Sequence, residues 1–211
     1  MSNHPWITTL KEKRVIAVIR SSDIELGHKM ALAVASGGVQ LIEITWNSAG
    51  AAQLISRLRT ELPDCTIGTG TLLNISQVKE AIITGSQFLF TPHVDTQMIQ
   101  LAVNMGVPMI PGALTPTEII TAWVNGAPCV KVFPVQALGG ASYIQSLQGP
   151  LGNIPLIPTG GVTMENASEF IQAGAIALGM SSQLFPPAKV ASGNWDAISQ
   201  QAKNLMQKMQ G

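Results

Sequence analysis

The sequence predicts an α/β protein, a (β/α)8 barrel of the TIM type preceded by an N-terminal helix. Short apolar runs typical of buried strands begin roughly every 20 to 26 residues, and a helical pattern follows each, for eight cycles. Alternating strands and helices form parallel sheets, and eight such units favour closure into a barrel. The alternative, an open doubly wound sheet, would carry a G-x-G-x-x-G motif after its first strand, and the sequence has none there.

The first strand–helix unit shows the local rules. Residues 7–13 are expected to form a short amphipathic helix that leads into a strand at 15–19, where all five residues are apolar. The cluster Ser21-Ser22-Asp23 offers N-cap side chains for a helix over 25–36. Gly37-Gly38 then ends that helix.

The later units repeat this pattern. The other expected strands are 41–45, 66–71, 88–91, 108–111, 130–133, 155–158 and 175–178. A helix over 49–62 ends at Pro63, and Asn74 and Asp95 cap helices that run to about residues 84 and 104. Pro116 and Glu118 suit the first turn of the next helix, and residues 194–208 form a final one. No linker or low-complexity segment divides the chain, so we expect a single domain over 1–211.

The composition narrows the class of protein. Of 211 residues, 46% are hydrophobic and 11% charged, which predicts a large core and a surface so poor in charge that it favours an oligomer. The net charge is zero and no basic tract occurs, so nucleic acid is not an expected partner.

The same features suggest where the protein works. Residues 1–14 lack the apolar segment of a secretory signal, and no apolar run is long enough to span a membrane. Cys65 and Cys129 have no metal-binding spacing, and we expect two reduced, buried thiols. A cytoplasmic protein without a membrane partner is therefore predicted.

Chemistry in such barrels is carried by residues at the carboxyl ends of the strands. Reading those ends in order identifies Arg20, Glu43, Thr45, Thr71, Thr91, Pro92, His93, Pro111, Lys131, Phe133, Thr159, Gly160, Gly161, Gly179, Ser181 and Ser182. We interpret His93 as a polar lining residue rather than a catalyst.

Lys131 is the outstanding member of this set, because it interrupts an apolar strand. A buried ammonium group is unfavourable, so burial lowers a lysine pKa and makes the nucleophilic amine available. Amines add to ketones and give iminium ions, which accept electrons when a neighbouring C–C bond breaks. The alternative is a strand-end lysine whose amine reaches solvent.

Glu43 is the only carboxylate at the strand ends and is the candidate proton-transfer group. Side chains alternate along strands, so Leu41, Glu43 and Thr45 share one face, as do Cys129, Lys131 and Phe133. If both faces point inward, Glu43 and Lys131 meet at the mouth of the barrel. The alternative for this pair is a structural salt bridge.

Two glycine-containing loops predict a phosphate site. Thr159-Gly160-Gly161 follows the seventh strand, and Gly179 to Ser182 follows the eighth. The loops after the last two strands of such barrels commonly bind phosphate through backbone N–H groups and hydroxyls. A tight turn would explain either loop alone.

Several motifs, in order, span residues 14–185 and resemble one family. They are Glu43-Ile-Thr, Gly68-Thr-Gly-Thr-Leu-Leu-Asn74, Thr91-Pro92, Pro111-Gly112, Lys131-Val-Phe-Pro134, Gly139-Gly140, Pro158-Thr-Gly-Gly-Val162 and Ser182. Together they resemble the 2-keto-3-deoxy-6-phosphogluconate (KDPG) and 4-hydroxy-2-oxoglutarate (KHG) aldolase family. The resemblance implies a class I aldolase on a TIM barrel, without metal or other cofactor, usually a homotrimer.

The resemblance also implies roles for individual residues. Lys131 would form the Schiff base and Glu43 would transfer protons, while Thr71 would contact the pyruvate carboxylate. The phosphate end of the substrate would be bound by Arg20, Gly160, Gly161 and Ser182. The remaining expected substrate-binding residues are Thr45, Asn47, Pro92, Phe133, Thr159 and Gly179.

Asn47 is a departure from the phosphogluconate-type pattern, which places an arginine in the segment Thr45-Trp46-Asn47-Ser48. Asparagine forms neutral hydrogen bonds only, and the segment is more similar to the phosphogalactonate-type members. The expected partners are thus a phosphorylated 2-keto-3-deoxy sugar acid and pyruvate, with either epimer open. Alternatives are a phosphosugar isomerase or epimerase, and a sugar-phosphate binding protein without turnover.

Overall fold

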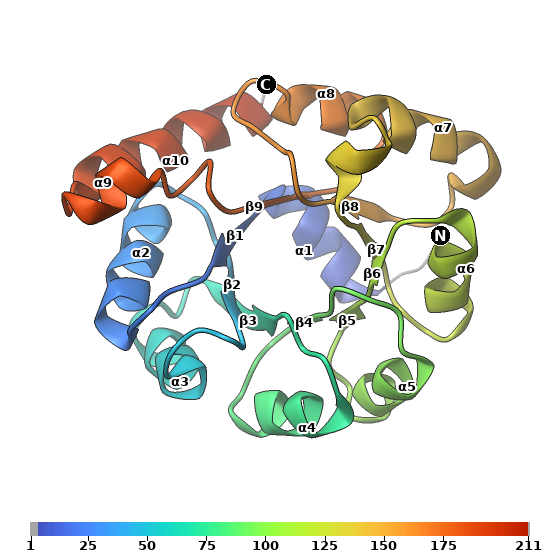
Figure 1. Ribbon diagram of the computed structural model, residues 1–211, viewed down its shortest axis with the longest axis horizontal. Helices are drawn as coiled ribbons and strands as arrows, with labels where there is room; N and C mark the ends of the chain where they lie inside the picture. Colours follow the sequence, from blue (N-terminus) through green and yellow to red (C-terminus); the bar gives the residue numbers. More distant parts are fainter. Residues whose placement is uncertain (1–3, 211) are drawn as a thin grey trace.

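The computed structural model describes residues 4–210. Residues 1–3, which belong to the segment expected to carry no secretory signal, and residue 211 lie outside the described part. Parallel strands form a curled sheet with the helices outside it (Figure 1). Among residues 4–210, no helix is long and apolar enough to cross a membrane.

The elements follow one another as predicted, strand then helix. The strands are β1 (Val15–Ile19), β2 (Leu41–Thr45), β3 (Thr66–Gly70), β4 (Leu89–Phe90), β5 (Met109–Ile110), β6 (Gly112–Ala113), β7 (Val130–Val132), β8 (Leu156–Pro158) and β9 (Leu178–Met180). The helices are α1 (Pro5–Lys13), α2 (Ile24–Ser36), α3 (Ala51–Glu61), α4 (Ile75–Ile83), α5 (Thr96–Asn104), α6 (Pro116–Val124), α7 (Ala141–Leu151), α8 (Ala167–Gln172), α9 (Pro187–Ala191) and α10 (Trp195–Gln210), with a short 3-10 turn η1 (Val135–Leu138).

The strands pair in parallel in two groups. Six strands run in the order β5-β4-β3-β2-β1-β9, and three run in the order β6-β7-β8. The expected fifth strand, 108–111, is observed as β5, and a further strand, β6, follows beyond its expected end. Pro111 separates the two, because proline has no N–H to donate to a ladder. The prediction of a parallel α/β fold is confirmed.

The expected eighth strand was placed too early. It was predicted at 175–178, but β9 begins at Leu178 and contains Gly179. Gly174 has φ +101° and the N–H of Ala175 donates to the Phe170 carbonyl, so these residues close α8 before the chain extends. Gly179 is therefore part of a strand, not of the loop that follows one.

Helix boundaries agree well with the capping residues. The side chains of Asp23, Asn74 and Asp95 each accept a backbone N–H at the start of α2, α4 and α5. Thr115 and Glu118 form a reciprocal capping box at the start of α6. These local signals therefore determine where the helices begin.

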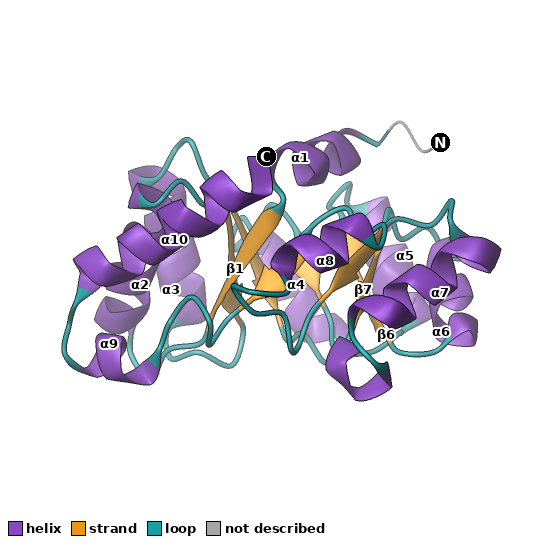
Figure 2. Ribbon diagram, turned by 90° about the horizontal axis from the view of Figure 1, so that it is seen from above, coloured by secondary structure: helices purple, strands orange, loops and turns teal. Residues whose placement is uncertain are grey.

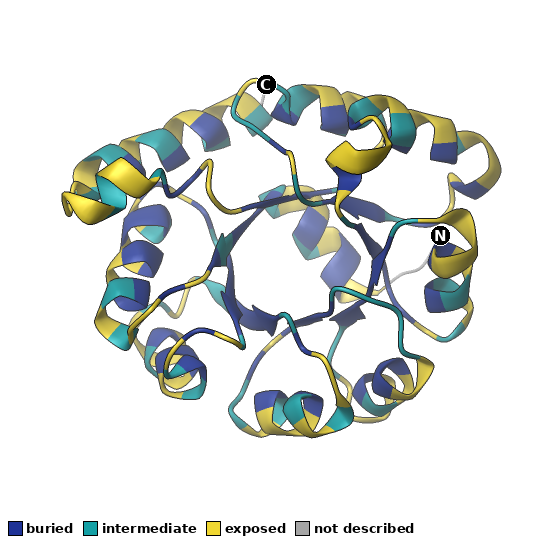
Figure 3. Cartoon of the chain, viewed as in Figure 1, coloured by how far each residue is buried: buried dark blue, intermediate teal, exposed yellow. Residues whose placement is uncertain are grey.

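The core has two parts. The larger lies between the sheet and the helices, whose inner faces are buried and outer faces exposed (Figure 3). The smaller lies on the inner side of the strands, where Trp6, Ile7 and Leu10 of α1 pack against strand residues such as Ile16 and Leu41. Figures 1 and 2 place α1 across one end of the strands. Since β1 follows α1 directly, that is the amino end, which leaves the carboxyl end for the site.

Candidate active site

A cavity of about 510 Å³ lies at the carboxyl ends of the strands. The residues that line it are Val18, Arg20, Glu43, Thr71, Pro92, Lys131, Phe133, Thr159, Gly160, Gly161, Val162, Gly179, Ser181 and Ser182. They come from β1, β2, β7 and β9 and from the segments that follow strands. The position and size suit a small-molecule site.

Lys131 is buried in the floor of this cavity. Its neighbours in β7, Val130 and Val132, face the helices, so Lys131 projects inward with only 7% of its surface exposed. Its Nζ lies 4.6 Å from the ring centroid of Phe133 and 5.7 Å from that of Phe90. This burial excludes the alternative of an amine that reaches solvent at the strand end.

The surroundings of Lys131 favour its neutral form. Burial lowers the pKa of the amine below 10.5, and the charge of Arg20 lowers it further, while Glu43 acts in the opposite direction. A larger fraction of Lys131 is therefore a free amine near neutral pH than for an exposed lysine. A free amine is the form that attacks a carbonyl carbon.

Glu43 extends from β2 into the same cavity and is 2% exposed. Burial raises the pKa of its carboxyl above 4.5, although Lys131 and Arg20 lower it. Within residues 4–210, no ion pair shorter than 4.0 Å joins Glu43 to Lys131, so the pair is not the salt bridge considered as an alternative. A carboxyl with a raised pKa keeps its proton to higher pH than an exposed glutamic acid, which suits a group that must both donate and accept a proton.

Arg20 and Thr71 lie together at the mouth. Arg20 Nη2 donates to Thr71 Oγ1 at 3.5 Å. Thr71 has φ +61°, a left-handed conformation that is rare for β-branched residues and unfavourable for them. The strained backbone places a hydroxyl beside a guanidinium in the cavity wall, a combination suited to an anion.

The glycine loop after β8 approaches the cavity through its backbone. Gly160 has φ +82° and Gly161 has φ +99°, both conformations that favour glycine. A Cβ on Gly160 would lie 3.3 Å from the Phe133 ring, so the loop also packs closely against the lysine strand's end. The Gln136 N–H donates to the Gly160 carbonyl at 3.1 Å and secures this loop.

Most of the predicted site residues are in the cavity wall, but Thr45 and Asn47 are not. Thr45 is buried, and its hydroxyl is hydrogen-bonded to Ser48 Oγ at 3.0 Å. Asn47 is exposed. His93 also lies outside the wall, where its carbonyl accepts a hydrogen bond from Thr91.

The cavity also contains Val18 and Val162, which were not among the expected strand-end residues, and Ser181, a strand-end residue to which no role was given. Val18 could have been found from the sequence, because side chains alternate along a strand and Val18 therefore shares a face with Arg20. Among residues 4–210, no group of three or more His, Cys, Asp or Glu side chains could hold a metal ion.

Comparison with known proteins agrees with the motifs. The family model "KDPG and KHG aldolase" matches residues 7–201. The 2-dehydro-3-deoxy-phosphogluconate aldolase of Treponema pallidum is 30% identical over 198 residues, which cover 94% of each chain.

Solved structures have the same fold. KDPG aldolase from Legionella pneumophila superposes with a TM-score of 0.88 at 23% identity, covering 97% of this chain and 99% of that one. A native KDPGal structure has a TM-score of 0.83 at 29% identity and covers 99% of this chain and 97% of that one. Since the family model and the match to the Treponema pallidum protein each span nearly the whole sequence, the chain belongs to the KDPG and KHG aldolase family.

Proposed function

We propose that the protein is a class I aldolase that cleaves 2-keto-3-deoxy-6-phosphogluconate to pyruvate and glyceraldehyde 3-phosphate. The observation that carries this proposal is the buried amine of Lys131 in a cavity whose only carboxylate is Glu43, within the described residues. Membership of the aldolase family supports the same chemistry.

The reaction begins at the C2 ketone of the substrate. The neutral Lys131 amine attacks C2 to form a carbinolamine, and Glu43 donates the proton that lets water leave and the iminium form. The C3–C4 bond then breaks, its electron pair moves into the enamine, and Glu43 accepts the C4 hydroxyl proton. Glyceraldehyde 3-phosphate departs, C3 is protonated, and water releases pyruvate and regenerates the amine.

The other cavity residues bind the two ends of the substrate. Thr71 contacts the carboxylate, and Arg20, Gly160, Gly161 and Ser182 bind the phosphate. Phe133, with its ring 4.6 Å from Lys131 Nζ, shields the iminium from water. A backbone loop, a hydroxyl and one guanidinium supply the donors that phosphate needs.

Borohydride trapping tests the covalent step. Incubation with pyruvate and borohydride should add one reduced pyruvyl group to Lys131, detected by peptide mass spectrometry, and Lys131→Met should abolish the adduct. A wild-type protein that turns over without an adduct would identify the isomerase or epimerase alternative instead. Binding of substrate without pyruvate release would identify a sugar-phosphate binding protein.

The galactonate-derived epimer is the second candidate substrate. Asn47 favours it, because the resemblance implies an arginine in this segment of phosphogluconate-type members. The 29% identity to a KDPGal structure is close to the 30% of the Treponema pallidum relative and does not separate the two epimers. Pyruvate release measured in parallel from both phosphorylated epimers, and from 4-hydroxy-2-oxoglutarate, decides among them. A higher kcat/KM for the galactonate-derived compound would overturn the primary assignment.

We also propose that the strands close into one eight-stranded barrel, in a single domain that works in the cytoplasm as a homotrimer. Closure is supported by the single residue, Pro111, between β5 and β6, and by the isolated parallel bridge between Thr159 and Gly179. The low charge content supports assembly. Light scattering should give three times the mass of one chain, and a monomer would contradict the trimer.

A further inference from the structure

The orientation of Glu43 has an unusual origin. Within residues 4–210, no hydrogen bond and no ion pair holds its carboxylate, which is nevertheless buried in the cavity wall. A carboxylate held by no polar partner must be oriented by packing. The surface against which it packs is Gly70 at the end of β3.

The contact between Glu43 and Gly70 crosses two neighbouring strands. Glu43 is in register with Gly68, and Gly70 follows two residues later on the same face of β3. The Glu43 side chain therefore leans along the strand toward the cavity and lies over the Cα of Gly70. A Cβ built on Gly70 would overlap Glu43 Oε1, and would lie 2.5 Å from Cδ and 3.1 Å from Cγ.

The backbone of Gly70 does not itself require glycine. Its φ is outside the left-handed region, unlike those of Gly160 and Gly161, so an alanine could adopt this conformation. Glycine weakens a strand and often marks a place where another group approaches closely. Here the group that approaches is the carboxylate of Glu43.

We propose that Gly70 is a positioning residue, whose missing side chain creates the seat of the Glu43 carboxylate beside Lys131. This inference rests on the proposed proton-transfer role of Glu43. A methyl group at position 70 would force the carboxylate out of its seat, because the β-sheet backbone on the other side is fixed by ladder hydrogen bonds. The carboxylate would then lie too far from the substrate to transfer a proton, and its pKa would fall.

The expected result for Gly70→Ala is a loss of turnover rather than of binding. Pyruvate release should fall at least about 10-fold, toward the 10²- to 10⁴-fold that a misplaced acid–base group loses. The pH dependence of kcat should move to lower pH on its acidic side, because a displaced carboxylate is better solvated and its pKa falls. KM should change less than kcat, since Gly70 is not itself among the residues that line the cavity.

A double-mutant cycle tests this seat directly, with the variants Gly70→Ala, Glu43→Ala and the two combined. Removing the carboxylate removes the overlap, so Gly70→Ala should have no further effect on turnover or melting temperature in the Glu43→Ala background. If Gly70→Ala alone fails to fold, restored folding in the double variant supports the seat equally. Gly149→Ala, at a helix position with open space, controls for glycine replacement.

The outcomes separate the two proposals. The role of Gly70 would be overturned if Gly70→Ala lowered turnover and melting temperature equally in the wild-type and Glu43→Ala backgrounds. It would also be overturned if Gly70→Ala left turnover and its pH profile unchanged. If Glu43→Ala alone retains full turnover, the proton-transfer role of Glu43 fails. In that case the melting temperatures of the three variants still test whether Gly70 and Glu43 are in contact, because the effects of the two substitutions would not be additive.

Discussion

Lys131 and Glu43 are both buried, and they line the same cavity. Burial shifts their pKa values in opposite directions, down for the amine and up for the carboxyl, and each shift favours the neutral form. The physical consequence is that the free amine and the protonated carboxyl are each present in a larger fraction near neutral pH than in exposed residues. The same desolvation should reduce the stability of the folded protein.

The first prediction concerns this loss of stability. Since the folded pKa of Glu43 lies above 4.5, its contribution is fully present below pH 4.5 and is lost as pH rises. Since the folded pKa of Lys131 lies below 10.5, its contribution is present above pH 10.5 and is lost as pH falls. Between pH 4.5 and pH 10.5 both groups therefore destabilise the folded protein. At pH 7 the double variant Glu43→Gln with Lys131→Met should be inactive but more stable than wild type, by about 1–4 kcal/mol.

Urea unfolding across this pH range measures the effect. The gain should shrink toward pH 4.5 and toward pH 10.5, because one of the two penalties disappears at each end. A double variant less stable than wild type at pH 7 would show that the polar pair contributes net stabilisation.

A second prediction separates the two anion sites of the substrate. Arg20→Gln should raise KM for the phosphorylated substrate at least about 10-fold, because a charge-assisted contact to phosphate is lost. The pyruvate concentration for half-maximal borohydride trapping should change little, since pyruvate carries no phosphate. Ser182→Ala should show the same pattern, whereas equal increases for both compounds would place Arg20 at the carboxylate.

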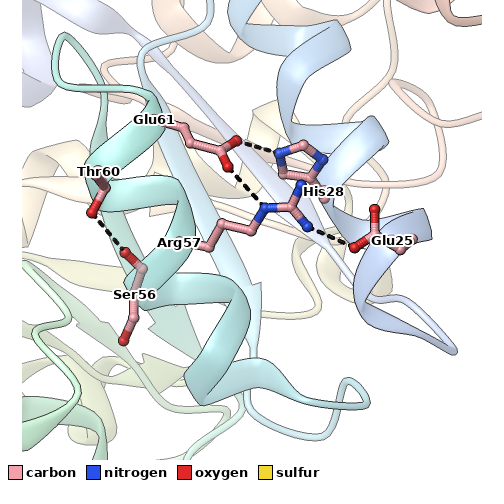
Figure 4. Close-up of polar contacts among 6 residues, drawn as sticks. All are labelled: Glu25, His28, Ser56, Arg57, Thr60 and Glu61. Carbon is pink, nitrogen blue, oxygen red and sulfur yellow. Dashed lines mark hydrogen bonds and ion pairs between the residues drawn. The ribbon is translucent and has the colours of Figure 1, made fainter.

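At the scale of elements, helices α2 and α3 are joined by a polar cluster (Figure 4). Glu61 accepts from His28 Nε2 at 2.5 Å and from Arg57 Nε at 2.9 Å, and Arg57 Nη1 donates to Glu25 at 2.6 Å. The cluster crosses between helices that are consecutive in the chain. It lies apart from the residues that line the cavity.

The third prediction follows from this cluster. The hydrogen bonds from Arg57 and His28 lower the pKa of the Glu61 carboxyl, so its contribution is present above pH 4.5 and is lost as pH falls through the folded pKa. Glu61→Gln should lower the melting temperature by a few degrees at most at pH 7, because the carboxylate of Glu61 and the guanidinium of Arg57 are both exposed to solvent, although His28 is buried. The difference should vanish in acid, and turnover should not change. Glu169→Gln on α8 serves as a matched control, and an equal loss there would contradict the prediction.

At the scale of the whole molecule, α1 closes the amino end of the strands and supports the floor beneath the site. Trp6 stacks on Phe88 at 4.9 Å, and Phe88 meets Phe90 edge-on at 5.8 Å. Phe90 in turn lies beneath Lys131. The N-terminal helix is thus connected to the active amine by a continuous aromatic column.

The fourth prediction tests this closure. Trp6→Ala should reduce the free energy of unfolding by about 3–5 kcal/mol, because it leaves a large cavity in the inner core. Trp6→Phe should retain most of the stability and activity, and Glu12→Ala on the exposed face of α1 should have little effect. Urea unfolding provides the measurement, and a loss below 1 kcal/mol for Trp6→Ala would show that α1 does not close the core.

Sequence patterns alone determined the alternation of strands and helices, most helix starts, and the candidacy of Lys131 and Glu43. These follow from interactions between residues close in the chain, such as Asn74 capping its own helix, or from side-chain alternation within a single strand. The misplaced start of β9 shows the limit, since an apolar run does not reveal where a helix closes.

Only the tertiary structure decided which side chains share the cavity. Thr45 alternates with Glu43 as expected, yet its hydroxyl is hydrogen-bonded to Ser48, and Asn47 is exposed and does not line the cavity. Gly70 lies within an expected strand, and only the register of β2 against β3 shows that the Glu43 carboxylate lies over it. The reason is physical: local patterns fix the direction of a side chain, but strand register and sheet curvature, set by contacts distant in sequence, decide what it meets.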